Sequence, residues 1–82
     1  VNWSAKDFED FIDYYKFKDL PFVSSLDDEY RKLSPKQYLY LIMVNAMNKD
    51  DATAEKIMGV SNVTIRSIKS RIKAKKAYHP SV

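Results

Sequence analysis

The stretch DATAEKIMGVSNVTIRSIKSRIKAKK, residues 51–76, decides the fold of this chain. It predicts a short helix at about residues 51–58 that Gly59 ends, because glycine readily adopts the left-handed conformation that closes a helix. Ser61 or Asn62 then caps a second helix that occupies the rest of the stretch. Isoleucines recur along that helix at spacings of four and three residues and form one apolar face: Ile65, Ile68 and Ile72. Two helices joined by a tight turn are therefore expected.

Upstream of this stretch, the first periodic segment predicts an amphipathic helix over residues 4–17. Ser4 and Asp7 have the spacing of a capping box at its start. Residues 20–23 contain a proline, which disfavours a helical conformation in the residue before it, and we expect them to form an apolar loop. A short helix over residues 25–33, capped by a serine, should follow.

The segment after Ser34 predicts the central helix of the core. Ser34 is a suitable N-cap, and Pro35 fits the first helical position, where its missing N–H is not needed. Residues 38–47 are apolar nearly all round, which is typical of a helix covered on several sides. The chain is therefore expected to be an all-α, small bundle of about five helices that ends in a helix-turn-helix.

Nothing in the sequence divides the chain, so residues 1–82 are expected to form a single domain. Within it, residues 1–32 supply acidic and aromatic helices, residues 33–76 the helix-turn-helix unit, and residues 77–82 a tail. The expected core residues are spread over all of the predicted helices: Trp3, Phe8, Phe11, Ile12, Phe22, Leu41, Ile42, Ile57, Val60, Ile65 and Ile68.

Charge is segregated along the chain. Residues 1–55 hold all 11 acids and 7 of the 14 lysines and arginines, a net charge of −4, whereas residues 56–82 hold 7 bases and no acid, a net charge of +7. Neutralisation of phosphates by lysine and arginine drives nucleic-acid binding, so this division favours contact of the carboxyl-terminal third with a polyanion. A solvated basic tail is the other interpretation of the same pattern.

Two short motifs carry a resemblance to a known family. They are Gly59-Val60-Ser61 followed by Thr64-Ile65, and Leu33-Ser34-Pro35-Lys36-Gln37 upstream. With them, residues 33–76 resemble the helix-turn-helix superfamily, most closely the LuxR/GerE type or region four of bacterial sigma factors. The resemblance implies sequence-specific binding of double-stranded DNA by a small bacterial or phage-type transcription regulator, with the helix over about residues 61–76 in the major groove.

The resemblance also implies which side chains would meet DNA. The residues expected to face the bases are Ser61, Asn62, Val63, Arg66, Ser67 and Ser70. Arginine pairs well with guanine and asparagine with adenine, so Arg66 is the strongest candidate for specificity. The residues expected to contact phosphates and set the orientation are Lys36, Thr64, Lys69, Arg71, Lys73, Lys75 and Lys76.

Several other classes of function are disfavoured by the composition. The chain has no cysteine, and His79 stands alone, so we expect neither a metal site nor a cofactor. Carboxylate pairs such as Glu9 and Asp13 lack a neighbouring nucleophile, and an enzyme is not expected. The apolar runs are too short to span a bilayer, which favours a cytoplasmic, nucleoid-associated protein without membrane contact.

Alternatives remain open at this point. The acidic, aromatic residues 1–32 could dock on RNA polymerase, a sigma factor or another regulator, with DNA contact secondary. Nonspecific coating of DNA would also suit the basic third. Because one helix-turn-helix unit makes few base contacts, a homodimer on a two-part site is a further expectation.

Overall fold

A computed structural model describes residues 4–76, and every helix or strand element that it shows in this part of the chain is a helix. Its elements, in chain order, are α1 (Ala5–Lys18), α2 (Leu20–Glu29), α3 (Pro35–Leu41), the π-helical turn η1 (Ile42–Ala46), α4 (Asp51–Met58) and α5 (Asn62–Ala74). Within the described residues there is no strand, only an isolated bridge between Tyr30 and Lys76. The predicted all-α bundle of five helices is confirmed.

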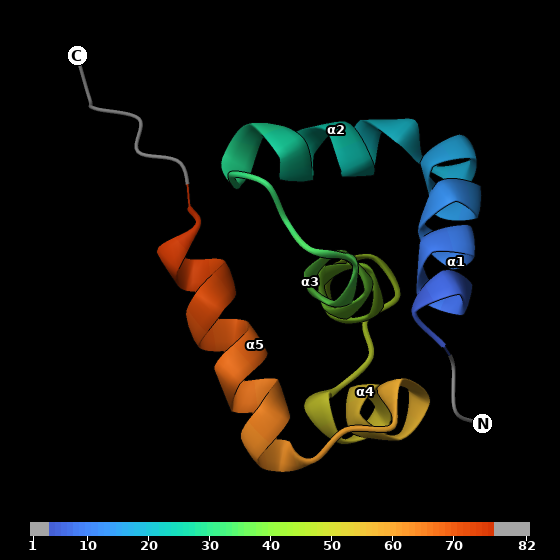
Figure 1. Cartoon of the computed structure of the whole chain (residues 1–82). Coiled ribbons are helices and arrows are strands. Elements are labelled where there is room, and N and C mark those ends of the chain that lie inside the picture. Colours follow the sequence, from blue (N-terminus) through green and yellow to red (C-terminus); the bar gives the residue numbers. More distant parts are fainter. Residues whose placement is uncertain (1–3, 77–82) are drawn as a thin grey trace.

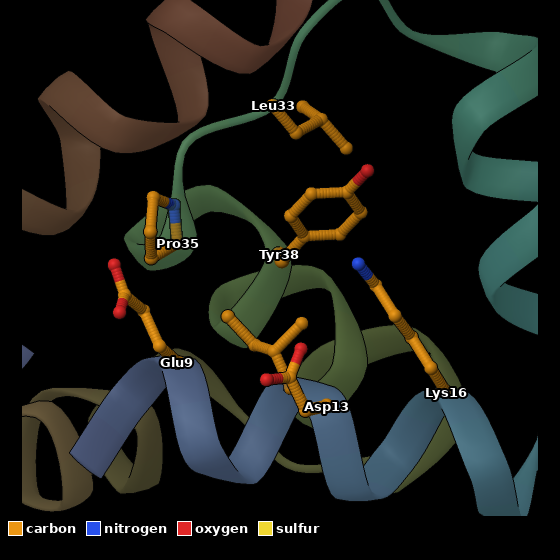
Figure 2. A pocket seen from close by; sticks show the side chains of 7 residues that line it. Glu9, Asp13, Lys16, Leu33, Pro35 and Tyr38 are labelled. Atoms are coloured by element: carbon orange, nitrogen blue, oxygen red, sulfur yellow. The ribbon is translucent and has the colours of Figure 1, made fainter. Parts of the chain in front are cut away.

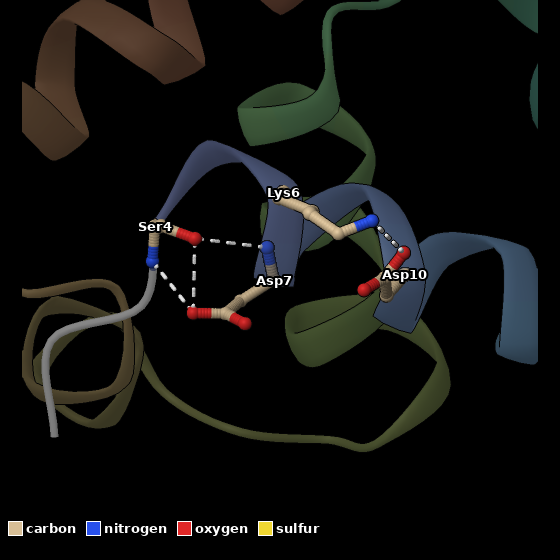
Figure 3. Close-up of polar contacts among 4 residues, drawn as sticks. All are labelled: Ser4, Lys6, Asp7 and Asp10. Carbon is tan, nitrogen blue, oxygen red and sulfur yellow. Dashed lines mark hydrogen bonds and ion pairs between the residues drawn. The ribbon is translucent and has the colours of Figure 1, made fainter.

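The start of α1 is held by the capping box that the sequence predicts. The backbone N–H of Asp7 donates to the Ser4 hydroxyl at 3.2 Å, and the backbone N–H of Ser4 donates to the Asp7 carboxylate at 2.8 Å (Figure 3). Lys6 lies 3.9 Å from Asp10 one turn further along, an exposed ion pair of small energetic weight. Two backbone N–H groups at this helix start are thus satisfied by local contacts.

The expected loop over residues 20–23 is wrong, because these residues form the first turn of α2. Asp19 is the N-cap, and its carboxylate accepts from the backbone N–H of Phe22 at 3.3 Å. Pro21 falls in that first turn, where a missing N–H costs no helical hydrogen bond. The expected serine cap is also wrong: the Ser25 hydroxyl donates back to the Phe22 carbonyl, and α2 ends at Glu29 rather than at residue 33.

The central helix begins as predicted but changes its winding halfway. The Ser34 side chain caps α3 together with Gln37 in a second capping box. After Leu41 the chain continues in π-helical geometry, in which the Met47 N–H donates to the Ile42 carbonyl at 3.0 Å. The wider turn keeps the segment helical to Ala46.

Three caps define α4, the turn and α5. Asp50 caps α4, and Gly59 ends it with φ 66° and ψ 37°, in the left-handed region that glycine adopts without strain. Ser61 caps α5 by accepting from the Thr64 N–H. Both helices have the bounds that the sequence indicated, except that α5 ends at Ala74. The connection of three residues, 59–61, is the length typical of a helix-turn-helix.

All the other helices surround α3, which is seen nearly along its axis at the centre of Figure 1. α1 contacts α3 on one side and α5 contacts it on the other. α4 contacts η1 and lies below α3 in this view. The largest fully buried side chains are Val23, Leu39, Ile42, Met43 and Ile65. A core that draws on α2, α3, η1 and α5 makes the fold depend on both ends of the chain.

The expected core residues divide into three groups. Six are buried: Phe8, Ile12, Leu41, Ile42, Ile65 and Ile68. Four are half-buried and pack against the buried ones: Phe11, Phe22, Ile57 and Val60. Trp3 lies outside the described residues, as does His79. None of the helices in residues 4–76 combines the length and the apolar character needed to cross a membrane.

Candidate nucleic-acid interface

Helix α5 has one apolar face and one polar face. Ile65, Ile68 and Ile72 are buried against α3 and α4, as their spacing predicts. The rest of the helix surface carries bases, short polar side chains and one exposed valine, and no acid lies anywhere after Glu55. The exposed face of α5 therefore presents positive charge and hydrogen-bonding groups, together with the apolar side chain of Val63.

The six residues expected to face bases all lie on this exposed surface. Asn62, Val63, Arg66, Ser67 and Ser70 are exposed on α5, and Ser61 is exposed at its cap. Val63 stands out because its side chain is apolar and yet 70% exposed at the start of the helix. The structure thus brings the predicted set together on the exposed surface of one helix and its cap, between residues 61 and 70.

One of these groups already has a structural role. The Ser61 hydroxyl accepts from the backbone N–H of Thr64 at 3.3 Å and lies 3.2 Å from the Thr64 hydroxyl. Thr64 is half-buried, whereas Asn62 beside it is exposed. These contacts orient the first turn of α5 and leave Asn62 and Val63 as the protruding side chains of that turn.

Asp51, in α4, forms hydrogen bonds with residues of α3 and α5 and so helps to fix the position of α5 on the bundle. Its carboxylate accepts from the Tyr40 hydroxyl of α3 at 2.6 Å and from the Lys69 ammonium of α5 at 3.1 Å. These two hydrogen bonds hold the pKa of the Asp51 carboxyl below its ordinary value. Burial, with the hydrogen bond to Asp51, raises the pKa of the Tyr40 hydroxyl. Lys69, expected at phosphate, is thus paired with an acid across the α4–α5 junction.

Lys75 is a second base with a contact inside the fold. Its ammonium donates to the backbone carbonyl of Lys32 at 2.9 Å and to the side-chain oxygen of Gln37 at 2.8 Å. The Lys75 carbonyl in turn accepts from the backbone N–H of Arg31 at 2.8 Å. These bonds attach the end of α5 to the loop before α3, and they give the buried Gln37 side chain a charged partner.

The remaining predicted bases are exposed: Lys36, Arg66, Arg71, Lys73 and Lys76. Within residues 4–76, the ion pairs join Lys6 to Asp10 and Lys69 to Asp51, so none of these five is held by an acid of the described chain. Lys36 directly precedes Gln37, whose contact with Lys75 brings the first turn of α3 beside the end of α5. The structure therefore divides these seven bases into five without an ion pair in the described residues and two, Lys69 and Lys75, that hydrogen-bond within the fold.

Sequence reasoning missed the roles of Tyr40, Asp51 and Gln37. The sequence indicates Asp51 only as part of a helix start, and Tyr40 only as part of the apolar central helix. Their contacts join residues 11, 18 and 38 positions apart in the chain. Helical periodicity and capping motifs concern residues within a few positions of one another and cannot predict contacts at these separations. The available signal for these contacts was the presence of polar side chains beside apolar helical faces.

A hollow of about 300 Å³ is lined by residues of α1, of α3 and of the segment that leads into α3. Its floor is formed by Ile12, Leu33, Pro35 and Tyr38, and Glu9, Asp13 and Lys16 extend over it from α1 (Figure 2). The Lys16 ammonium lies 5.6 Å from the centre of the Tyr38 ring. The Tyr38 hydroxyl donates to Asp27, and burial together with this bond raises the pKa of Tyr38 to about 12.

In residues 4–76, no three His, Cys, Asp or Glu side chains are placed to hold one metal ion. The lining of the hollow offers two carboxylates and one ammonium beside apolar side chains.

Comparison with known proteins adds no relative to this picture. No family model, no curated protein and no solved structure matches the chain.

Proposed function

We propose that this protein binds double-stranded DNA sequence-specifically and acts as a small transcription regulator, with α5 in the major groove. The observation that carries the proposal is the exposed face of α5, which carries bases and short polar side chains and, Lys69 with Asp51 excepted, no ion pair with an acid of the described residues, while the opposite face is packed on the bundle. An α-helix of this composition is the element that the major groove admits.

The turn before α5 supports the proposal. A helix can read bases only if it protrudes from its bundle, and α5 follows α4 after only three residues. Gly59 in its left-handed conformation and the hydrogen bonds of Asp51 hold the two helices in one arrangement. The recognition surface is therefore rigid before DNA arrives, which reduces the entropy lost on binding.

The exposed groups divide into two roles. Arg66 can donate two hydrogen bonds to guanine, Asn62 can pair with adenine, and Val63 can touch a thymine methyl group. Arg71, Lys73 and Lys76 at the far half of the helix, with Lys36 beside them, would neutralise phosphates and fix the register. Lys69 and Lys75 contribute to this role less, because each has a partner within the fold.

The test is a comparison of two exposed bases on a duplex site obtained by selection. Arg66→Ala should lose about 1–3 kcal/mol of binding free energy and should relax the preference at one base pair. Lys6→Ala is the matched control, since Lys6 is an exposed base on α1, on the other side of the bundle. Its affinity should stay within about 0.5 kcal/mol of wild type.

Equal losses in the two variants would contradict the proposed role of α5. If scrambled duplexes bound as tightly as the selected site, the protein would be a nonspecific coating protein instead. Absence of binding even at low salt would reject DNA as the partner altogether.

A docking function for the amino-terminal half is the second candidate. The observation that favours it is the hollow between α1 and α3, where Glu9 and Asp13 extend over an apolar floor. A partner such as RNA polymerase or a sigma factor would place a basic side chain there. Because α1 and α2 supply Phe8, Val23 and Leu26 to the core, the test requires Glu9→Gln with Asp13→Asn in the full chain rather than a truncation. Loss of such a partner with DNA binding intact would support docking.

A further inference from the structure

The corner between α1 and α2 carries an apolar surface that the fold leaves uncovered. Phe17 is 95% exposed, Leu20 is 60% exposed and Tyr14 is 59% exposed. Helix α1 already buries its other apolar face through Phe8, Ile12 and Tyr15, so these residues are not needed for the core. Clustered large apolar side chains at a surface typically mark a site of protein association.

The charges around this corner are balanced. Residues 13–20 contain two acids, Asp13 and Asp19, and two bases, Lys16 and Lys18. The acids that make the amino-terminal half negative on α1, Asp7, Glu9 and Asp10, lie at the opposite end of that helix. A strongly acidic or strongly basic partner would therefore find no complementary field at the corner, whereas a surface with the same mixed charges would not be repelled.

The apolar surface is hollowed rather than flat. A depression of about 550 Å³ is lined by Asp13, Lys16, Phe17 and Leu20. Asp13 and Lys16 also line the hollow between α1 and α3, so the two depressions adjoin along one side of α1. A protruding aromatic side chain next to a depression is the arrangement that lets two identical surfaces fit each other.

We propose that this corner, formed by Tyr14, Phe17 and Leu20 with Asp13 and Lys16, is the contact surface of a symmetric homodimer. In a two-fold interface the same surface of both copies is in contact, and every contact occurs twice. Phe17 of each copy therefore enters the depression beside Leu20 of the other. Asp13 of each copy then lies near Lys16 of the other, which satisfies both charges twice. A second copy of the chain necessarily carries the aromatic side chain that fits the depression, Phe17. The two-fold axis also places its Asp13 and Lys16 in the reverse order, as the charge pairing requires.

This dimer does not depend on DNA binding by α5. The corner and α5 lie on opposite sides of α3 (Figure 1), so dimerisation leaves the basic face of α5 accessible. If both proposals hold, one dimer carries two reading helices, which is the usual way for units with few base contacts to reach specificity. Failure of DNA binding would leave the dimer intact, and failure of the dimer would leave one α5 to bind alone.

The first test is sedimentation equilibrium of the full chain at concentrations up to about 1 mM, a range that includes weak specific association. Wild type should show a monomer–dimer equilibrium. Phe17→Ser should weaken it at least about tenfold, because each dimer buries two copies of this side chain. Val63→Ser is the matched control, an exposed apolar residue on α5 that should leave the equilibrium unchanged. Both variants should keep the wild-type helical circular dichroism spectrum, since neither side chain is in the core.

The second test uses the symmetry of the charge pair. Asp13→Lys or Lys16→Asp alone should weaken dimerisation, since each places like charges together twice. The double variant Asp13→Lys with Lys16→Asp should restore it, because the pair is then complementary in reverse. A wild-type chain that stays monomeric over the whole range, a Phe17→Ser chain that associates as wild type does, or a double variant no better than the single ones would overturn the proposal.

Discussion

Helices α1 and α5 both pack an apolar face on α3, from opposite sides, but they differ in the side chains that they expose to solvent. Each buries three large apolar side chains at helical spacing, Phe8, Ile12 and Tyr15 in α1 and Ile65, Ile68 and Ile72 in α5. The outer face of α1 is acidic at its start and aromatic at its end. The outer face of α5 instead carries lysines and arginines together with short polar side chains.

This difference teaches that fold and recognition are assigned to separate faces of each helix. The buried faces are interchangeable in character, since both are apolar stripes that cover α3. The exposed faces contribute little to stability, as isolated surface charges usually do. Substitutions should therefore fall into two classes, those that change stability on either helix and those that change binding on only one.

The largest expected loss of stability comes from substitutions in the buried faces of α1 and α5. Ile65→Ala and Ile12→Ala should each lower the free energy of unfolding by about 2–5 kcal/mol, because each leaves a cavity in a packed interface. Urea unfolding followed by circular dichroism measures both. Val63→Ala, on the exposed face of α5, should change stability by less than about 0.5 kcal/mol. If Ile12→Ala were as mild as Val63→Ala, α1 would not belong to the cooperative core.

A smaller effect concerns Asp51, the residue that ties α5 to α3 and α4. Asp51→Asn removes the charge that meets Lys69, and stability near pH 7 should fall by about 1 kcal/mol, a modest value because the pair is partly exposed. The folded-state pKa of Asp51 lies below its ordinary value of 3.8. Its contribution is therefore complete above that value and is lost as the pH falls through the folded pKa.

The measurement is urea unfolding of wild type and Asp51→Asn at several pH values. The difference in stability should be present at about pH 7 and should shrink as the pH drops below about 4. Glu9→Asn is a suitable control, since Glu9 is an exposed acid of α1. A difference that stayed constant down to strongly acidic pH would mean that the Asp51 charge does not hold α5.

The smallest expected effects distinguish two neighbouring lysines. Lys75→Met should lower stability by about 0.5–1 kcal/mol, because Gln37 and the Lys32 carbonyl lose a donor. Lys73→Met should leave stability unchanged but should weaken duplex binding and reduce the slope of log affinity against log salt by about one. Salt titrations of binding and urea unfolding of both variants measure the contrast. Identical behaviour of the two lysines would remove the distinction between bases that hold the fold and bases that are exposed for a partner.

Local sequence signals predicted most of this fold. The Ser4–Asp7 capping box, the Ser34-Pro35 start, Gly59 and the Ser61 cap each act within four residues of the backbone groups that they satisfy, so the sequence alone reports them. The exception was α2, where Pro21 was interpreted as a helix breaker although Asp19 caps the turn that contains it.

The candidate interface was only partly predictable for a related reason. Helical periodicity separates the buried isoleucines of α5 from its exposed polar residues, so the exposed set follows from the sequence. Periodicity does not show that Lys69 and Lys75 find partners at Asp51 and Gln37, because these depend on how the helices pack. The composition of a basic segment therefore overstates the number of bases available to a partner.

The central claim is that the exposed face of α5, and not α1, meets duplex DNA. Backbone amide chemical shifts, recorded by NMR as duplex DNA is added to the full chain at low salt, test it most directly. We expect the largest changes at the exposed positions of α5, with Arg66 and Lys73 among them, and smaller ones at Lys36, while α1 stays unchanged. Changes confined to α1, or none at all at saturating duplex, would contradict it.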